Sequence, residues 1–336
     1  MATETPVLHL RLPRQRLRKT AAHLLELRND TTLSPVPREN PLEPSVRIVC
    51  ISDTHNLQPS LPPGDLLVHA GDLTEWGTFD ELQKQLSWLS SQPHQYKIVI
   101  AGNHDLLLDD HFLNRHPERR DSKGRTRHDL DFGSVTYLQD ECVTLSFARE
   151  KRSLSIYGSP WTPRYGTSAF QYPRDDDVWS NRVPASVDIL ITHGPPAGFN
   201  NIKPSAGCSY LRQEVARVKP KLMVFGHIHA ARGEQTVTFD AAQSLYDGIV
   251  EGSRGWESVL LLAGAVAWAQ VQRWCGRESR STRMINAAVV DGMDKEVALA
   301  ALSLELILRL CEIFIDDNLS IKIIPLQQSL RPTGIY

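Results

Sequence analysis

Five short motifs in this 336-residue sequence combine residue types that bind metal ions. Each contains aspartate, asparagine or histidine, and four of the five contain histidine. In chain order they are Asp53-Thr54-His55, Gly71-Asp72, Gly102-Asn103-His104-Asp105, Thr192-His193-Gly194 and Gly226-His227-Ile228-His229. Imidazole, carboxylate and amide ligands without thiolates suit Mn²⁺, Fe or Zn²⁺ better than Ca²⁺, and Mg²⁺ is a weaker candidate. The motifs together predict a centre for divalent metal ions.

Each motif also has a plain structural explanation, because Asp, Asn and Gly favour turns after strands. Turn formation does not, however, require histidine in four of five motifs, so the metal-centre interpretation is favoured. His69, just before the Gly71-Asp72 turn, is expected to lie in the core or to support a metal ligand. The remaining histidines lie in polar, irregular sequence and are expected to be exposed; they are His9, His23, His94, His111, His116 and His128.

The motifs follow short apolar runs that predict buried β-strands at residues 46–51, 66–70, 97–101, 155–157, 187–192 and 222–225. Residues 78–90 and 209–218 have apolar residues at helical spacing, and Thr78 with Glu81 forms a capping-box pattern. Strands alternating with helices predict an α/β domain with a largely buried sheet. Ligands in such sheets gather beyond the carboxyl ends of the strands, so strand ends can bring the five motifs together.

Composition and charge set only broad limits. A formal net charge of −2 gives no global reason to expect nucleic acid or an anionic membrane as a partner. The five cysteines are widely spaced without a CxxC pair, which argues against a disulfide framework and suits a reducing compartment. The longest apolar run, residues 259–269, is too short to span a bilayer. We expect a soluble cytoplasmic protein, with a mitochondrial presequence as the alternative for the basic N-terminus.

Three segments are expected along the chain. Residues 1–45 form a partly disordered leader and linker, with a basic helix over residues 16–28 and a Pro-rich stretch after it. Residues 46–291 form the main domain. It carries an insertion near residues 252–283, whose 259–268 part is a buried or interface helix, and a late strand over residues 284–290. Residues 292–336 form a divergent C-terminal helix and tail, since residues 297–315 have apolar side chains at helical spacing.

The motif set resembles the calcineurin-like metallophosphoesterase superfamily, over roughly residues 47–290. Residues 71–75, 96–104, 157–160 and 188–196 are similar to the branch that includes brain-expressed metallophosphoesterase-domain proteins and uncharacterised fungal relatives. The resemblance implies a four-layer α/β/β/α sandwich of two mixed β-sheets flanked by helices. It also implies two metal ions at the edge of the sheets.

The resemblance assigns the ligands of these two ions. One ion takes Asp53, His55, Asp72 and His229, and the other takes Asp72, Asn103, His193 and His227, so that Asp72 bridges them. Mn²⁺ is favoured, with Fe or Zn²⁺ as alternatives. Two such ions can share a water and lower its pKa, and the resulting bridging hydroxide would attack phosphorus.

The resemblance also implies a proton donor. His104 would protonate the oxygen of the leaving group, a role that suits histidine because it exchanges protons near neutral pH. Relatives often carry an aspartate three residues after the bridging aspartate, where it orients this histidine. Glu75 stands at that position here, and a surface or capping carboxylate is the alternative for it.

The loop after residue 158 is implied to lie near the metal ions. Trp161, Arg164 and Tyr165 are therefore predicted to contact the substrate, and the alternative is a rigid surface loop with a partly buried tryptophan. The expected activity is hydrolysis of a phosphoric ester, with a phosphodiester favoured over a monoester and a cyclic nucleotide among the candidate substrates.

Two other functions stay open. A phosphoprotein phosphatase is less expected, because Leu73-Thr74-Glu75 follows Asp72 where that class has a GDxVDRG motif. A non-catalytic metal-binding scaffold of the same fold is the other alternative. The sequence leaves the substrate, the native metal and the oligomeric state undetermined.

Overall fold

The computed structural model describes residues 12–29, 46–149, 151–199, 206–277, 279–289, 312–315 and 321–324. The chain divides into two compact units. The helical unit comprises Met1–Glu39 and Val237–Ser281, and the sandwich unit comprises Asn40–Thr236 and Thr282–Tyr336. Among the described residues, no helix has the length and apolar character that crossing a bilayer would require.

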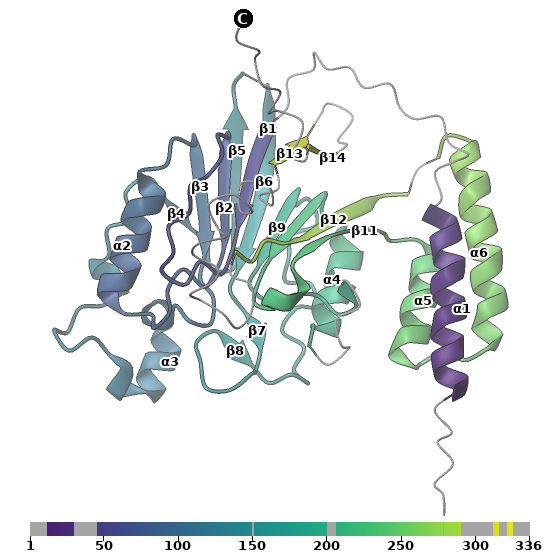
Figure 1. Ribbon diagram of the computed structural model, residues 1–336, viewed down its shortest axis with the longest axis horizontal. Helices are drawn as coiled ribbons and strands as arrows, with labels where there is room; N and C mark the ends of the chain where they lie inside the picture. Colours follow the sequence, from purple (N-terminus) through teal and green to yellow (C-terminus); the bar gives the residue numbers. More distant parts are fainter. Residues whose placement is uncertain are drawn as a thin grey trace, which may run out of the picture. The chain divides into compact units, whose positions relative to one another are not determined.

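The sandwich unit contains two six-stranded mixed sheets (Figure 1). The first has the order β14-β13-β1-β2-β3-β4, and the second has the order β11-β12-β10-β9-β6-β5. In the first sheet, β1 (Val46–Ile51), β2 (Leu66–Ala70), β3 (Tyr96–Ile100) and β4 (Thr136–Tyr137) are parallel. In the second, β6 (Arg152–Ser159), β9 (Ile189–Thr192), β10 (Leu222–Phe225) and β12 (Ser281–Asn286) are parallel.

The remaining strands complete the sheets. β5 (Glu141–Phe147) pairs antiparallel with β6, and β11 (Gly233–Thr238) lies at the far edge of the second sheet. β7 (Thr162–Pro163) and β8 (Gln171–Tyr172) form a separate two-stranded sheet. The predicted mixed α/β architecture, with sheets flanked by helices, is confirmed.

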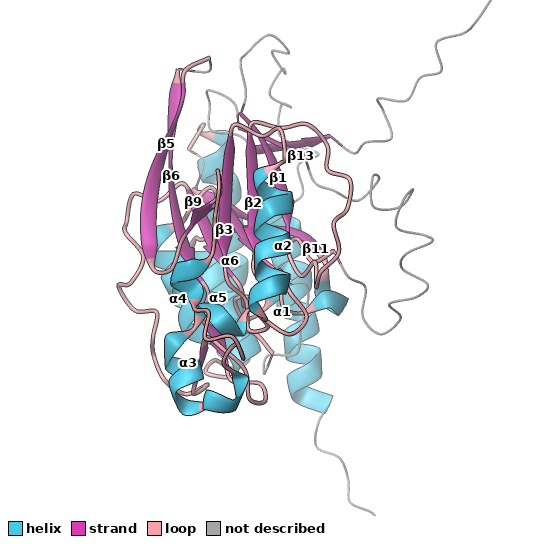
Figure 2. Cartoon of the chain, turned by 90° about the vertical axis from the view of Figure 1, so that its left-hand side faces the viewer, coloured by secondary structure: helices cyan, strands magenta, loops and turns pink. Residues whose placement is uncertain are grey.

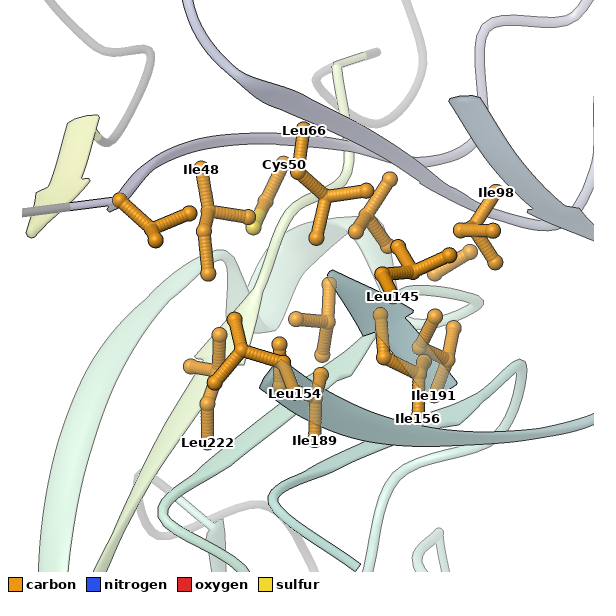
Figure 3. Close-up of a cluster of buried hydrophobic side chains, with 14 of the residues drawn as sticks. Ile48, Cys50, Leu66, Ile98, Leu145, Leu154, Ile156, Ile189, Ile191 and Leu222 are labelled. Atoms are coloured by element: carbon orange, nitrogen blue, oxygen red, sulfur yellow. The ribbon is translucent and has the colours of Figure 1, made fainter. Parts of the chain in front are cut away.

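The main core lies between the two sheets (Figure 3). Alternate residues of each strand point into it, because side chains of a strand alternate between its two faces. Ile48, Val68 and Ile100 come from the first sheet, and Ile156 and Ile191 come from the second. All are fully buried, so this apolar core holds the two sheets together.

Helices cover the outer face of the first sheet (Figure 2). Val49, Leu67 and Val99 point away from the main core toward α2 (Phe79–Ser90) and α3 (Asp110–Arg115). The predicted capping box of α2 is present: the Thr78 side chain accepts from the Glu81 amide and Glu81 accepts from the Thr78 amide. The helix predicted over residues 209–218 is α4 (Ser209–Val218).

The helical unit consists of α1 (Leu12–Asn29), α5 (Ala241–Glu251) and α6 (Glu257–Trp274). Leu17 and Ala21 of α1 share a core with Ile249, Leu262 and Val266. The basic helix predicted in the leader is therefore confirmed, and it packs on the helix predicted in the insertion. Nothing in the pattern of the N-terminal segment alone indicated this partner.

Two predictions from the sequence are wrong. A helix is predicted over residues 297–315, but its last four residues, Glu312–Ile315, form the strand β13, which pairs antiparallel with β1. Residues 297–311 lie outside the described part. A short apolar run is compatible with either element, and pairing with a strand edge overrides helical spacing. His94, predicted to be exposed, is buried, with a ring nitrogen 3.1 Å from the Pro62 carbonyl oxygen.

Candidate metal centre

Five loops at the carboxyl ends of strands carry the predicted ligands. Asp53 follows β1, Asp72 follows β2 and Asn103 follows β3 in the first sheet. His193 follows β9 and His227 follows β10 in the second sheet. Because both sheets present these ends at the same edge, side chains far apart in sequence come within reach of one another.

The backbone at these strand ends is unusual. Asp53, His55, Asp72 and His227 have φ of 54°, 43°, 54° and 67°. This left-handed region costs a residue with a side chain roughly 1–2 kcal/mol. Such costs are typical of functional sites, where surrounding structure holds a side chain in a required direction.

Glycines in the motifs make room for the carboxylates. A Cβ atom added at Gly226 would collide with the Asp53 carboxylate and the Ser52 hydroxyl. A Cβ atom at Gly102 would collide with the Asp72 carboxylate. The glycine at each of these positions is therefore required by the close approach of the metal-binding side chains.

The predicted ligands form groups of facing donor atoms. Asp53, His55 and His229 form one group, and Asp72, His193 and His227 form another, with the donor atoms of each within 4.8 Å of one another. A third group of the same kind, His55, Asp72 and His104, shares a residue with each of these two. In the first, His229 Nε2 lies 3.2 Å from Asp53 Oδ1 and 3.4 Å from His55 Nε2.

Asp72 belongs to the second group and also lies close to the first. Its Oδ2 is 3.3 Å from His193 Nε2 and 3.8 Å from His55 Nε2. Asn103 joins the second group through its Oδ1, 3.1 Å from His193 Nε2. Asp72 is therefore placed close to the donor atoms of both groups, which is the position that a bridging ligand would need.

The carboxylates are held ionised within the protein. Burial by itself raises the pKa of Asp53, but the hydrogen bond from His229 and the charge of His193 give a net lowering. Burial also opposes ionisation of Asp72, and the adjacent His193 nevertheless lowers its pKa. Two buried anions a few ångströms apart favour a cationic partner.

The histidines respond in opposite ways to the same surroundings. Burial lowers the pKa of His193, but the Asp72 carboxylate outweighs it and raises that pKa to about 9. Burial and the neighbouring His193 lower the pKa of His227 to about 4. The Asp72 carboxylate thus favours a positive charge on His193, while His227 is neutral. A divalent cation would take the place of that positive charge, and the mixture of imidazole and carboxylate donors fits such an ion. The Nε2 atoms of His55 and His229, which face each other, are likewise suited to share a positive ion.

His104 is oriented by the main chain. Its Nδ1 donates to the Glu75 carbonyl oxygen at 2.8 Å, which leaves Nε2 free to take part in proton transfer. Its backbone amide donates to Asp72 Oδ1 at 2.8 Å. The Glu75 carboxylate instead lies 3.7 Å from His55 Nδ1. The expected orienting contact therefore comes from the Glu75 backbone.

Asp105 is a residue to which the sequence analysis assigned no role. Its buried carboxylate accepts from the amides of Gly102, Leu73 and Thr74 at 2.8, 3.2 and 3.1 Å and from the Thr74 hydroxyl at 2.8 Å. It thus ties the loop of Asp72 to the loop of Asn103. Burial raises its pKa to about 6. The sequence feature that could have indicated this role is the position of Asp105 at the end of the third motif, Gly102-Asn103-His104-Asp105.

His69 contacts the chain segment that carries two of the predicted ligands, Asp53 and His55. It is fully buried, and its Nε2 lies 2.9 Å from the hydroxyl of Thr54, which stands between Asp53 and His55. Burial lowers the pKa of His69 to about 3, so it is neutral at physiological pH. This placement agrees with the expectation of a core or supporting histidine.

The three predicted substrate contacts lie outside the metal-binding groups. Trp161 is half-buried, and its indole N–H donates to Asp140 Oδ2 at 2.8 Å, which fits a rigid loop. Tyr165 is 80% exposed and Arg164 is also exposed. Within the described part, neither side chain hydrogen-bonds to a predicted metal ligand. Arg164 lines a pocket that also includes Ser168, which contacts the predicted ligand Asn103.

Comparison with known proteins agrees with this geometry. A profile of the family described as calcineurin-like phosphoesterase matches residues 46–231, which include every predicted metal ligand. Human metallophosphoesterase domain-containing protein 1 is 41% identical over 222 residues, 60% of this chain and 66% of that protein. A UPF0046 protein of Caenorhabditis elegans is 36% identical, over 61% of this chain and 76% of that protein.

A third relative has a different name. The probable rhamnogalacturonate lyase C of Emericella nidulans is 42% identical over 250 residues, which are 74% of this chain but 23% of that protein. The chain thus spans about a quarter of this relative and just under two thirds of the human one.

Proposed function

Since the chain belongs to the calcineurin-like phosphoesterase family, we propose that it hydrolyses a small-molecule phosphodiester in a reaction that depends on two divalent metal ions. The observation that carries this proposal is the pair of donor groups with Asp72 close to both, assembled from five strand ends. Cyclic nucleotides belong to the proposed substrate class. The lyase name of the Emericella nidulans relative gives no support for another activity, since this chain corresponds to 23% of that protein.

The proposed ligand sets follow the two groups. Asp53, His55 and His229 with Asp72 would hold one ion, and Asp72 with Asn103, His193 and His227 would hold the other. Mn²⁺ fits this mixture of carboxylate, amide and imidazole donors. When bound, the ions supply positive charge for the phosphoryl oxygens and a water of low pKa.

His104 is proposed as the general acid. The Glu75 carbonyl fixes the proton on Nδ1, so Nε2 is the atom that would carry the transferable proton. Its ring lies 4.8 Å from that of His55, centroid to centroid, and it therefore borders the metal-binding groups. A donor in this place can protonate the oxygen of the departing alcohol as the ester bond breaks.

Hydrolysis of bis(4-nitrophenyl) phosphate by the purified chain with Mn²⁺ tests the proposal. Asp72→Ala should abolish the activity, because it removes the ligand close to both groups. Asp176→Ala, at an exposed position, is the matched control and should retain full activity. Full activity in Asp72→Ala would refute the ligand assignment.

Two further measurements separate the alternatives. Metal analysis after Mn²⁺ loading should give two ions per chain, and binding of metal without hydrolysis of any ester would indicate a scaffold. Rates on 4-nitrophenyl phosphate and on a phosphopeptide, compared with the diester, distinguish a phosphodiesterase from a phosphatase.

A further inference from the structure

The sandwich unit has a pocket with a volume of about 280 Å³, and Ser168 in its lining contacts the predicted metal ligand Asn103. Part of the lining comes from the end of α3 and the residue after it, with Arg115 and His116. Another part comes from the loop between β7 and β8, with Arg164, Thr167 and Ser168. Pockets for drug-sized ligands usually exceed ~300 Å³, so this one suits a single small group.

One residue of the pocket lining, Ser168, contacts the predicted metal ligand Asn103. The Ser168 hydroxyl donates to the Asn103 carbonyl oxygen, and the Asn103 side-chain amide lies 3.4 Å from the same hydroxyl. The Ala169 amide also donates to the Asn103 carbonyl oxygen, at 3.2 Å. A molecule in the pocket would therefore lie one side chain away from the groups that hold the metal ions.

The lining is cationic. Two arginines and a histidine face the pocket with two hydroxyl groups, and none of the lining residues that the structure describes is acidic. His116 Nδ1 lies 3.3 Å from Glu118 Oε1, and the Arg115 Nε donates to the His111 carbonyl oxygen. These contacts leave the rest of the Arg115 guanidinium available.

Neither pocket arginine has a carboxylate partner among the described residues, in contrast to other arginines of this unit. Arg125 is held by Asp80 and Asp121, and Arg182 is held by Asp140. Arginines that face a concave surface without a carboxylate partner are available to bind a phosphate or carboxylate through several hydrogen bonds.

We propose that this pocket binds a second anionic group of the substrate, so that the preferred substrate is a phosphoric ester whose organic part also carries a phosphate or a carboxylate. The proposal rests on the proposed function, because it assumes that the scissile phosphate lies at the metal centre. Arg164 and Arg115 determine specificity by contacting the second anion, and the Thr167 hydroxyl donates a further hydrogen bond to it, whereas the Ser168 hydroxyl donates to the Asn103 carbonyl oxygen.

Two diesters with the same leaving group provide the test. One is thymidine 5′-(4-nitrophenyl phosphate), and the other is the same compound with a 3′-phosphate. We expect kcat/KM with Mn²⁺ to be about tenfold higher for the 3′-phosphorylated diester, since a hydrogen bond to a charged group contributes this much. The gain should lie mainly in KM and should shrink at high salt, because the pocket is open to solvent.

Variants assign the effect to the pocket. Arg164→Ala and Arg115→Ala should each reduce the preference toward one, and Arg164→Lys should retain part of it. Arg149→Ala removes the same charge at an exposed turn between β5 and β6 and should leave the preference intact. A wild-type ratio of one, a ratio unchanged in both pocket variants, or an equal loss in Arg149→Ala would overturn the proposal.

Binding separates failure of the pocket from failure of the catalytic proposal. Calorimetric titration of the Mn²⁺-loaded chain should show tighter binding of thymidine 3′,5′-bisphosphate than of thymidine 5′-phosphate, and Arg164→Ala should abolish the difference. If neither diester is hydrolysed but this difference is found, the proposed function fails and the pocket assignment stands. Equal binding of both nucleotides would refute the pocket assignment even in an active enzyme.

Discussion

The metal-binding edge of the sandwich unit and the core of the helical unit place opposite demands on the sequence. At the edge, the Asp53 carboxylate occupies the space beside Gly226, and nothing larger than glycine fits there. In α6, a Cβ atom added at Gly264 would meet no atom within 4 Å. The first region requires particular residues at particular backbone angles, whereas the second requires only enough apolar area on one face.

The apolar residues of α6 show how loose the second requirement is. Leu262 is fully buried, but Leu260 is 80% and Trp274 is 89% exposed. Helical packing uses one side of this helix and leaves apolar residues on the other. We therefore expect changes at the sandwich edge to abolish activity, and changes in the helical unit to alter stability alone.

The largest expected effect comes from adding one methyl group at the edge. Gly226→Ala should displace the Asp53 carboxylate, and Mn²⁺-dependent diester hydrolysis should fall at least about a thousandfold, because bound metal contributes several kcal/mol to the transition state. Metal content and kcat/KM are the measurements. Gly264→Ala is the matched control and should leave both unchanged. Near-normal activity in Gly226→Ala would contradict the proposed packing.

Removing a buried side chain from the helical unit should lower the stability of that unit and leave the activity unchanged. Leu262→Ala should lower the free energy of unfolding of that unit by about 3 kcal/mol, as typical for a buried leucine. Hydrogen exchange of α1 and α6 would measure this loss, and kcat/KM should stay at the wild-type value. Leu260→Ala, at an exposed position of the same helix, is the control and should cost less than about 0.5 kcal/mol. Loss of activity in Leu262→Ala would show that the two units are functionally coupled.

The same contrast explains what could be predicted from the sequence. Strands β1, β2 and β10 and helix α4 match their predicted bounds, because short apolar runs between turn residues and a regular helical spacing are local signals. The convergence of Asp53, Asp72 and His193 also follows from local order, since parallel strands end at the same edge.

Other features depend on contacts between distant segments, which one sequence does not encode locally. The contact that orients His104 comes from the Glu75 main chain, and any residue at that position supplies a carbonyl oxygen. The packing of α1 on α6 joins segments more than 200 residues apart. The apolar spacing of a helix predicts the helix but not the segment against which it packs. β13 forms where the edge of β1 accepts an apolar run whose spacing also suits a helix.

At the metal-binding edge, a substitution of His104 should reduce proton donation without reducing metal binding. His104→Gln should reduce hydrolysis of diphenyl phosphate about a hundredfold, because a general acid typically contributes this much when the leaving group is a poor one. The loss should be smaller for bis(4-nitrophenyl) phosphate, since nitrophenolate departs without a proton. Metal content should remain at the wild-type value. Equal losses on both diesters would argue against His104 as the acid.

The smallest effect concerns a histidine beneath the edge. His69 has its pKa lowered to about 3 by burial, against about 6.5 in an unfolded chain. Between these values the unfolded state binds a proton that the folded state does not, so the free energy of unfolding falls as pH falls. The slope from this one group approaches about 1.4 kcal/mol for each pH unit below 6.5.

Urea unfolding of the sandwich unit between about pH 7 and pH 5 measures this slope. His69→Gln should flatten the pH dependence relative to wild type, because glutamine can keep the hydrogen bond to Thr54 without titrating. His128→Gln, at an exposed position, should retain the wild-type slope. The helical unit, monitored by hydrogen exchange of α6 in the same samples, should not share the effect, because His69 belongs to the sandwich unit. An unchanged slope in His69→Gln would mean that other groups carry the acid sensitivity of this fold.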